Sequence, residues 1–310
     1  MQYRASPGFV RQLEEVRPGW LSLAVVDEAD TAAFAREMCS ADVLLHVLEP
    51  VTASVIAAAP GLKLIQKIGV GVNTIDVEAA RAAGVAVCNM PGSNSRAVAE
   101  SALLLMLAAL RRAAEVDRRT RQGLGWRLDP AIFDGMGELG GRTVGLVGFG
   151  AIPRALAPVL GALGCEVLYT ARSPKPDAPA TWCGLDELLR RSDVVSLHLP
   201  LTPDTAGLIG AAAIDAMKPG VVLVNTARGG LVHEPALVAA LRSGKVRAAG
   251  LDVFAIEPAA AANPLFGLDN VVVSPHVAWL TPETLGRSVR IAVENCALLR
   301  QGAPLINRVA

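Results

Sequence analysis

Short apolar runs recur along the whole chain, and longer segments with helical spacing separate them. In the first third, the runs that predict strands are 21–26, 42–47, 63–68 and 85–89. The segments between them that predict helices are 30–39, 52–59 and 76–83. Both faces of these runs look apolar, so helices should cover both faces of the sheet. This alternation predicts an α/β fold on a parallel sheet.

The pattern of strands starts again in the middle of the chain. After a predicted long helix at 93–112 and a glycine-rich stretch at 121–141, further strands are expected at 143–148, 166–170, 193–197, 221–225, 248–252 and 271–274. A restart of this kind favours a second domain over one extended sheet. The length agrees, because 310 residues exceed the usual size of one hydrophobic core. We therefore expect two doubly wound parallel-sheet domains.

Composition excludes several classes of function. The chain is 52% hydrophobic, which excludes a disordered protein, and 29 basic residues balance 29 acidic ones. No global positive field therefore favours nucleic acid or an anionic membrane as a partner. Five cysteines occur without a CxxC pair, so neither a metal site nor a disulfide framework is predicted. The longest apolar stretch is about half of a membrane helix and the N-terminus lacks a signal-peptide core, so we expect a cytoplasmic protein.

The segment TVGLVGFGAIP, residues 143–153, predicts a strand, a glycine turn and a helix. Gly148 allows the tight turn, and Gly150 lets the backbone approach a pyrophosphate closely. The helix N-terminus then offers free N–H groups and a partial positive charge. Because a strand precedes the motif and another follows it, we expect a dinucleotide site. Its contacts are predicted at Gly148, Phe149, Gly150, Ala151 and Ile152.

Two departures from the usual dinucleotide pattern bear on the cofactor. Pro153 stands where a third glycine is common, which removes one phosphate donor, and Arg154 follows it. Ala171 occupies the position of the acid that normally binds the ribose hydroxyls, and Arg172 and Ser173 come next. A guanidinium can bind a 2′-phosphate bidentately. The sequence therefore favours NADP over NAD, with NAD possible; Arg172 as a solvated turn residue is the alternative.

Four later motifs carry a family resemblance: HLPLTPDT at 198–205, VNTARGG at 224–230, GLDVFAIEP at 250–258 and SPHVA at 274–278. Together with the glycine turn they resemble the D-2-hydroxyacid dehydrogenases, which include the glyoxylate and hydroxypyruvate reductases. The resemblance implies a Rossmann-type cofactor domain inserted into a flavodoxin-like substrate domain.

On this resemblance the substrate domain comprises 1–95 and 281–310, and the NAD(P)-binding domain comprises 96–280. The family is generally dimeric, so a homodimer is expected, with contacts from the helix at 93–112 and the segment around Trp126.

The same resemblance implies a catalytic set of Arg228, Glu257 and His276. Reduction of a 2-oxo acid places negative charge on the oxygen at C2, and a histidine that titrates near neutral pH can protonate it. A carboxylate beside the imidazole fixes its tautomer, which suits Glu257. The planar fork of Arg228 can bridge the substrate carboxylate and carbonyl oxygen. The predicted reaction is hydride transfer between a nicotinamide and a small 2-oxo or 2-hydroxy acid, with glyoxylate or hydroxypyruvate favoured.

The resemblance implies further contacts. In the first domain, the backbone N–H groups of Val70 and Gly71 should hold the substrate carboxylate. The remaining cofactor contacts that the resemblance implies are Val98, Leu199, Pro200, Thr226, Ala227, Asp252 and Ala278. For Asp252, the implied role is binding the nicotinamide carboxamide, and the alternative is capping a turn.

Some features leave alternatives open. Trp279 stands where a small residue is more usual, so it either narrows the substrate pocket or packs at the domain hinge. His46 ends an apolar strand and is interpreted as structural, or else it faces the cleft. A nucleotide-sensing protein similar to the corepressors of this family, and an enzyme similar to formate dehydrogenase, are the alternative functions.

Overall fold

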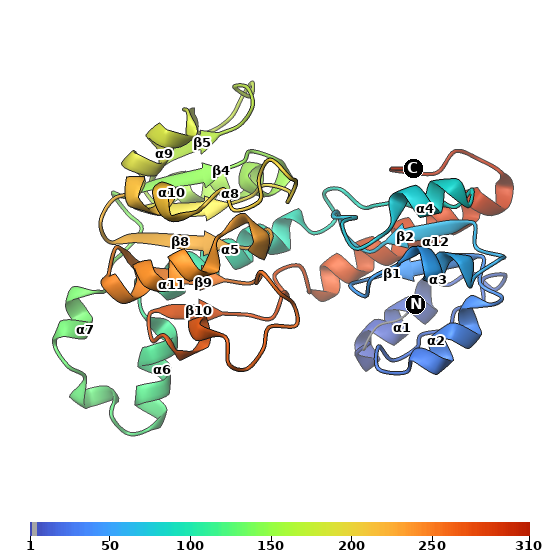
Figure 1. The fold of residues 1–310 in the computed structure, drawn as a ribbon, viewed down its shortest axis with the longest axis horizontal. Coiled ribbons are helices and arrows are strands. Elements are labelled where there is room, and N and C mark those ends of the chain that lie inside the picture. The colour runs from blue at the N-terminus through green and yellow to red at the C-terminus, as the bar shows by residue number, and fades with distance from the viewer. Residues whose placement is uncertain (2–4) are drawn as a thin grey trace. The chain divides into compact units, whose positions relative to one another are not determined.

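The computed structural model describes Met1 and residues 5–310. This part of the chain divides into two compact units: Met1–Asn94 with Leu280–Ala310, and Ser95–Trp279. The first unit is therefore discontinuous in sequence, and Figure 1 shows its last helix, in red, beside the blue and cyan elements of the N-terminal part. Within the described residues, every helix is too short or too polar to cross a membrane.

The first unit contains a three-stranded parallel sheet in the order β1-β2-β3, formed by β1 (Val43–His46), β2 (Leu64–Lys67) and β3 (Ala86–Cys88). Its helices are α1 (Pro7–Val16), α2 (Thr31–Met38), α3 (Ala53–Ala57), α4 (Val77–Ala82) and α12 (Pro282–Gln301). All four residues of β2 are buried, as expected for a strand that helices cover on both faces.

The strand expected at 21–26 is wrong. Of these residues only Val26 takes part in β-pairing, and the rest of the segment is irregular. It lies beside the N-terminus, where the Met1 ammonium donates to the Ala24 carbonyl at 2.9 Å and the Val26 N–H donates to the Met1 carbonyl at 2.8 Å. An apolar run indicates burial, but a strand also requires a continuous ladder of partners, and the described residues give this segment none beyond Val26.

The second unit contains a seven-stranded sheet in the order β10-β9-β8-β7-β4-β5-β6, and every neighbouring pair is parallel. The strands are β4 (Thr143–Val147), β5 (Glu166–Thr170), β6 (Thr181–Trp182), β7 (Val194–Leu197), β8 (Val221–Asn225), β9 (Val246–Leu251) and β10 (Val271–Val273). The order reverses between β4 and β7, which is the switch point of a doubly wound fold. The predicted α/β architecture with parallel sheets is confirmed.

The α-helices of the second unit are α5 (Ser95–Leu110), α6 (Ala113–Arg121), α7 (Ala131–Asp134), α8 (Ala151–Ala162), α9 (Leu185–Arg191), α10 (Ala211–Ala216) and α11 (Glu234–Ser243). Three short 3₁₀ helices complete it: η1 (Gly125–Arg127), η2 (Gly229–Leu231) and η3 (Pro264–Gly267). Figure 1 shows α6 and α7, in green, projecting from the body of the sheet. Helix α5 packs closely on β9, since a Cβ at Gly250 would lie 2.7 Å from Leu105 Cβ.

Parallel strands place their carboxyl ends at one edge of the sheet, and this edge collects the chemistry of the second unit. The turn at Gly148 follows β4, Arg228 lies just beyond β8, Asp252 directly follows β9 and His276 lies just beyond β10. The candidate active site is therefore built from four strand ends.

Candidate active site

His276 and Glu257 form a close pair. The Nδ1 atom of His276 lies 2.6 Å from Oε2 of Glu257, and both side chains are partly exposed. The other Glu257 oxygen, Oε1, accepts from the Phe254 N–H at 2.9 Å, so the carboxylate is fixed on both sides. Because Nδ1 faces the carboxylate, Nε2 is the ring nitrogen left for a reacting group.

The backbone at His276 is also constrained. Its φ is +56°, in the left-handed region, and its N–H donates to the carbonyl of Asp252 at 2.7 Å. The indole Nε1 of Trp279 donates to the carbonyl of His276 at 3.1 Å. Trp279 therefore braces the loop that carries the histidine, a contact that the sequence pattern did not indicate.

Asp252 organises the same loop. Its carboxylate accepts from the Ser274 hydroxyl at 2.5 Å and from the N–H groups of Val277 and Ala278, each at 2.9 Å. Burial raises the pKa of Asp252, and these hydrogen bonds oppose the rise. Both oxygens hold the turn, as the capping alternative requires. Oδ1 accepts two of these hydrogen bonds and Oδ2 accepts one, so Oδ2 keeps a further lone pair that is compatible with a carboxamide contact.

Arg228 is positioned by the turn after β8. Asn225, which is 1% exposed, donates through Nδ2 to the Arg228 carbonyl at 2.9 Å and accepts from the Ala227 N–H at 3.0 Å. Nη1 of Arg228 donates to the Ala227 carbonyl at 2.6 Å. A Cβ at Gly229 would overlap the carbonyl carbon of Phe254, so only glycine lets this turn approach the loop that carries Glu257.

The charges of the three predicted catalytic residues act on one another. Burial lowers the pKa of Arg228, and the charge of Glu257 partly offsets this. Burial alone would raise the pKa of Glu257, but the hydrogen bonds from His276 and Phe254 and the charge of Arg228 bring it below its ordinary value. Glu257 is therefore a carboxylate at neutral pH. The structure brings Arg228, Glu257 and His276 into one electrostatic group.

The glycine turn fits a dinucleotide phosphate. Gly148 has φ +98°, and a Cβ there would lie 2.6 Å from the His198 carbonyl oxygen. A Cβ at Gly150 would meet no described protein atom within 4 Å, so the protein itself leaves this space open. Gly150 is the N-cap of α8 and supplies no side-chain cap, which leaves the N–H groups of Ala151 and Ile152 for a ligand.

Pro153 is buried in the first turn of α8 without disturbing it, because its missing N–H would have had no intrahelical partner. The Arg154 guanidinium lies 5.4 Å from the ring centroid of Phe149. The ring centroids of Phe149 and Tyr169 lie 4.0 Å apart. The arginine that follows the proline thus places its charge beside Phe149 of the glycine turn.

Arg172 and Ser173 are exposed in the loop after β5. The Ala171 carbonyl accepts from the Trp182 indole at 3.2 Å, which fixes the start of the loop. Among the described residues, Arg172 has no carboxylate partner.

The other predicted cofactor contacts lie around the same edge. Leu199 and Pro200 follow β7, next to a pair in which Ser196 Oγ lies 3.0 Å from His198 Nε2. Burial lowers the pKa of His198 to about 4, so this ring is neutral near pH 7. Thr226 Oγ1 is buried with no hydrogen-bond partner in the described structure, which is an unsatisfied group that a ligand can pair with.

Val70 and Gly71 belong to the first unit, in the loop after β2. Within the described part of the chain their N–H groups have no hydrogen-bond acceptor, and the Val70 carbonyl accepts from Asn89 at 2.9 Å. These donors remain available to a carboxylate.

His46 is 3% exposed, its Nε2 lies 2.6 Å from the Glu49 carbonyl, and burial together with the charge of Lys67 lowers its pKa to about 4. His46 is thus a buried neutral ring.

Several positioning residues were missed from the sequence: Asn225, Ser274 and Gly229. No spacing rule marks an asparagine that holds a turn, but the glycine could have been found, because a glycine directly after a candidate arginine indicates close backbone approach.

Val98, which the resemblance implies as a cofactor contact, lies in α5 and is 4% exposed.

The sequence and the structure of this chain match those of known proteins. Residues 103–278 match the NAD-binding domain of the D-isomer specific 2-hydroxyacid dehydrogenases. The chain is 44% identical over 282 residues to the D-3-phosphoglycerate dehydrogenase of Mycobacterium leprae, covering 89% of this chain and 52% of that protein. The chain thus spans about half the length of that relative.

Two further proteins match over most of their length. A glyoxylate reductase of Aeropyrum pernix is 40% identical over 280 residues, which cover 86% of this chain and 83% of that protein. The crystal structure of the TT0316 protein of Thermus thermophilus superposes with a TM-score of 0.91 at 39% identity, covering 100% of this chain and 99% of that one. Strand order, strand-end residues and these matches agree: the chain belongs to the D-isomer specific 2-hydroxyacid dehydrogenase family.

Proposed function

We propose that this protein is a nicotinamide-dependent oxidoreductase that interconverts small 2-oxo and 2-hydroxy acids. The observation that carries the proposal is the pairing of His276 Nδ1 with Glu257 Oε2 at 2.6 Å, with Arg228 in the same electrostatic group. This arrangement supplies a proton donor and a fixed cation for the two places where a 2-oxo acid carries or develops negative charge.

In the reducing direction, Arg228 binds the substrate carboxylate and the oxygen at C2 through its planar fork. When bound, the reduced nicotinamide supplies the hydride that reaches C2. His276 gives the proton on Nε2 to the developing alkoxide, and Glu257 stabilises the charged imidazole before that transfer. Burial strengthens the interaction of Arg228 with the substrate charge, because fewer waters screen it.

We assign the cofactor to the second unit and the substrate carboxylate to the loop of Val70 and Gly71 in the first. The open space at Gly150 and the free first-turn N–H groups of α8 support a pyrophosphate there. Arg172, exposed and without a carboxylate partner among the described residues, supports a preference for NADP(H) over NAD(H).

Glyoxylate or hydroxypyruvate is the substrate that we favour, in keeping with the glyoxylate reductase of Aeropyrum pernix. The second candidate substrate is 3-phosphohydroxypyruvate, the 2-oxo acid that corresponds to 3-phosphoglycerate. The 44% identity to the D-3-phosphoglycerate dehydrogenase of Mycobacterium leprae favours it.

The test is a set of initial rates on one purified sample, with NADPH and NADH each paired with glyoxylate, hydroxypyruvate, pyruvate and 3-phosphohydroxypyruvate. Turnover faster with NADPH supports both the reaction and the role of Arg172. Turnover that favours NADH keeps the reaction and removes the assignment of Arg172. Cofactor binding without turnover of any 2-oxo acid contradicts the proposed reaction and favours a nucleotide-sensing role.

We also propose a homodimer formed through the second unit. The arm around α6 and α7 exposes Trp126 (89%) and Phe133 (55%), and α5 exposes Leu104 (64%). Large aromatic side chains this exposed are typical of interface cores.

A further inference from the structure

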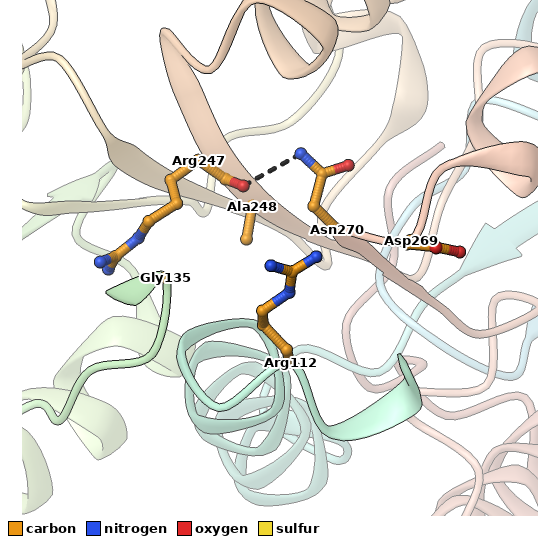
Figure 2. A pocket seen from close by; sticks show the side chains of 6 residues that line it. All are labelled: Arg112, Gly135, Arg247, Ala248, Asp269 and Asn270. Carbon is orange, nitrogen blue, oxygen red and sulfur yellow. Dashed lines mark hydrogen bonds between the residues drawn. The ribbon is translucent and has the colours of Figure 1, made fainter. Parts of the chain in front are cut away.

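A second candidate site lies at the opposite edge of the seven-stranded sheet from the catalytic residues. It is a cavity of about 170 Å³, and the residues that line it are Arg112, Gly135, Arg247, Ala248, Asp269 and Asn270. Figure 2 shows the Arg112 and Arg247 side chains on different sides of Ala248. Arg247 and Ala248 lie at the amino end of β9, whereas Asp252 follows its carboxyl end. The cavity is therefore distinct from the site at the strand ends.

The cavity contains cationic groups with unused donors. Nε of Arg112 and both Nε and Nη2 of Arg247 are buried and have no hydrogen-bond partner in the described part of the chain. A buried donor without an acceptor destabilises the fold, and more so when it is charged, so such groups call for a ligand or ordered solvent.

A third guanidinium faces the same region. A Cβ at Gly137 would lie 2.5 Å from Arg142 Nη2 and 3.6 Å from Arg247 Nη2, so both groups point at this stretch of backbone. Arg142 Nε donates to the Glu138 carbonyl rather than to a carboxylate. Burial and the charge of Arg142 lower the pKa of Arg247, and Asp193 opposes this.

The nearby carboxylates are already paired. Glu115 binds Arg112 Nη2 at 2.7 Å and Arg119 Nε at 3.0 Å. Asp269 binds Arg118 at 2.8 Å, and in Figure 2 its carboxylate lies on the side away from Arg247. Asp193 binds Lys218 at 2.9 Å and accepts from the Thr143 N–H. Arginines outnumber acids here, and Arg142 and Arg247 lack a carboxylate partner among the described residues.

We propose that this cavity binds a small phosphate-bearing anion. Guanidinium groups bind phosphate through paired, charge-assisted hydrogen bonds, and a tetrahedral anion can accept from Arg112 on one side and Arg247 on the other. The volume is sufficient, because a cavity of about 150 Å³ holds a molecule the size of benzene. The ligand is free phosphate or the phosphate of a small ester.

The binding test is calorimetric titration with inorganic phosphate and then methyl phosphate. It uses the whole protein in phosphate-free buffer at low salt with saturating NADPH, so that the pyrophosphate site and the proposed 2′-phosphate site of the cofactor are both filled. We expect saturable binding to one site per chain, weakened at least tenfold in Arg247→Gln. The matched control is Arg121→Gln, which also removes one arginine of the second unit but from an exposed pair with Asp117. It should bind as the parent protein does.

Tighter binding of methyl phosphate than of phosphate identifies an ester as the ligand, and the reverse identifies free phosphate. The proposal is overturned if no saturable binding occurs, if Arg247→Gln binds as tightly as the parent, or if Arg121→Gln weakens binding equally. Should Arg247→Gln fail to fold, Ala248→Val narrows the cavity without changing its charge and should weaken binding in the same way.

Thermal unfolding gives an independent readout. Without phosphate, Arg247→Gln should unfold at the parent's temperature or above it, because the substitution removes a partly buried cation whose Nε and Nη2 are buried without partners among the described residues. With phosphate, the parent's midpoint should rise and the variant's should not. Equal rises in both proteins would contradict the assignment. None of these measurements depends on the 2-oxo acid reaction.

Discussion

At the residue scale, His276 is held by more contacts than a proton donor alone requires. Its ring is bound by Glu257, its N–H by the Asp252 carbonyl, and its carbonyl by the Trp279 indole. With the backbone in the left-handed region, these contacts preserve a conformation that a free loop would rarely adopt. Nε2 therefore points in one direction before substrate arrives, which reduces the reorganisation needed for proton transfer.

Replacement of His276 by asparagine should lower kcat by about 10²- to 10⁴-fold, the usual contribution of general acid–base catalysis. Asparagine tolerates positive φ, so the loop should survive and the dissociation constant of NADH should not change. Steady-state rates and a fluorescence titration of NADH measure both quantities. His233→Asn is the control, because His233 is an exposed N-cap that accepts from the Ala236 N–H and asparagine caps helices well. Normal turnover of His276→Asn would refute the role of this residue.

The motifs in the sequence could single out candidate site residues, but the sequence could not predict the hydrogen bonds that position them. The motifs pointed to Arg228, Glu257 and His276, and the strand ends placed them at one edge. Asn225, Ser274 and Trp279 position the site through hydrogen bonds to Arg228, Asp252 and His276. These bonds cross loops, and no local sequence pattern predicts the path of a loop. For Asp252 the resemblance implied a cofactor contact, with capping a turn as the alternative, and its oxygens do hold the 274–278 turn.

At the scale of elements, a buried asparagine of α12 hydrogen-bonds to two other parts of the first unit. Asn295 is fully buried, and its Nδ2 donates to Gln66 Oε1 at 2.6 Å and to the Ile306 carbonyl at 3.1 Å. Its Oδ1 accepts from the Ile306 N–H at 2.8 Å. One side chain thus connects the helix, strand β2 and the C-terminal segment.

Asn295→Ala should destabilise the first unit by about 2–4 kcal/mol, because it leaves the buried Oε1 of Gln66 and the part-buried N–H and carbonyl of Ile306 without these partners. Urea denaturation followed by circular dichroism measures the change, with the two units allowed separate transitions. Glu294→Ala, an exposed neighbour on the same helix, should stay within about 0.5 kcal/mol of the parent. If the two variants unfold alike, the Asn295 network does not stabilise the unit.

Element types in the second unit could be predicted because continuous apolar runs bounded by turns identify buried parallel strands. The two-residue strand β6 is too short to leave such a pattern, and the run at 21–26 has the pattern without the partners. The predicted helix at 93–112 ends at Leu110, and Arg112 with φ +50° separates it from α6. Local sequence gave no sign of that break.

At the scale of the whole molecule, the proposed dimer depends on the arm that projects from the second unit. Trp126→Glu should place a charge in the buried centre of that interface and weaken association by at least about 30-fold, the cost of one strong interface residue. Light scattering coupled to size exclusion, run over a dilution series, measures the mass. Leu163→Glu alters another exposed apolar residue of the same unit, at the end of α8, and should leave the mass unchanged. A parent protein that runs as a single chain would disprove the dimer.

The discontinuous first unit has a consequence for how the protein is made. Residues 95–279 are contiguous in sequence, so this unit does not depend on a distant segment of the chain to complete its fold. The first 94 residues cannot complete their fold until the C-terminal segment has been made. Arg287 binds the Ser93 carbonyl, and the backbones of Val309 and Ala310 pair with Val87. At elongation rates of about 5–20 residues per second, the early segment waits on the order of 10 seconds or longer for its last partner. The portion made first is thus finished last, and during that interval it is the part of the nascent chain that most needs protection from aggregation.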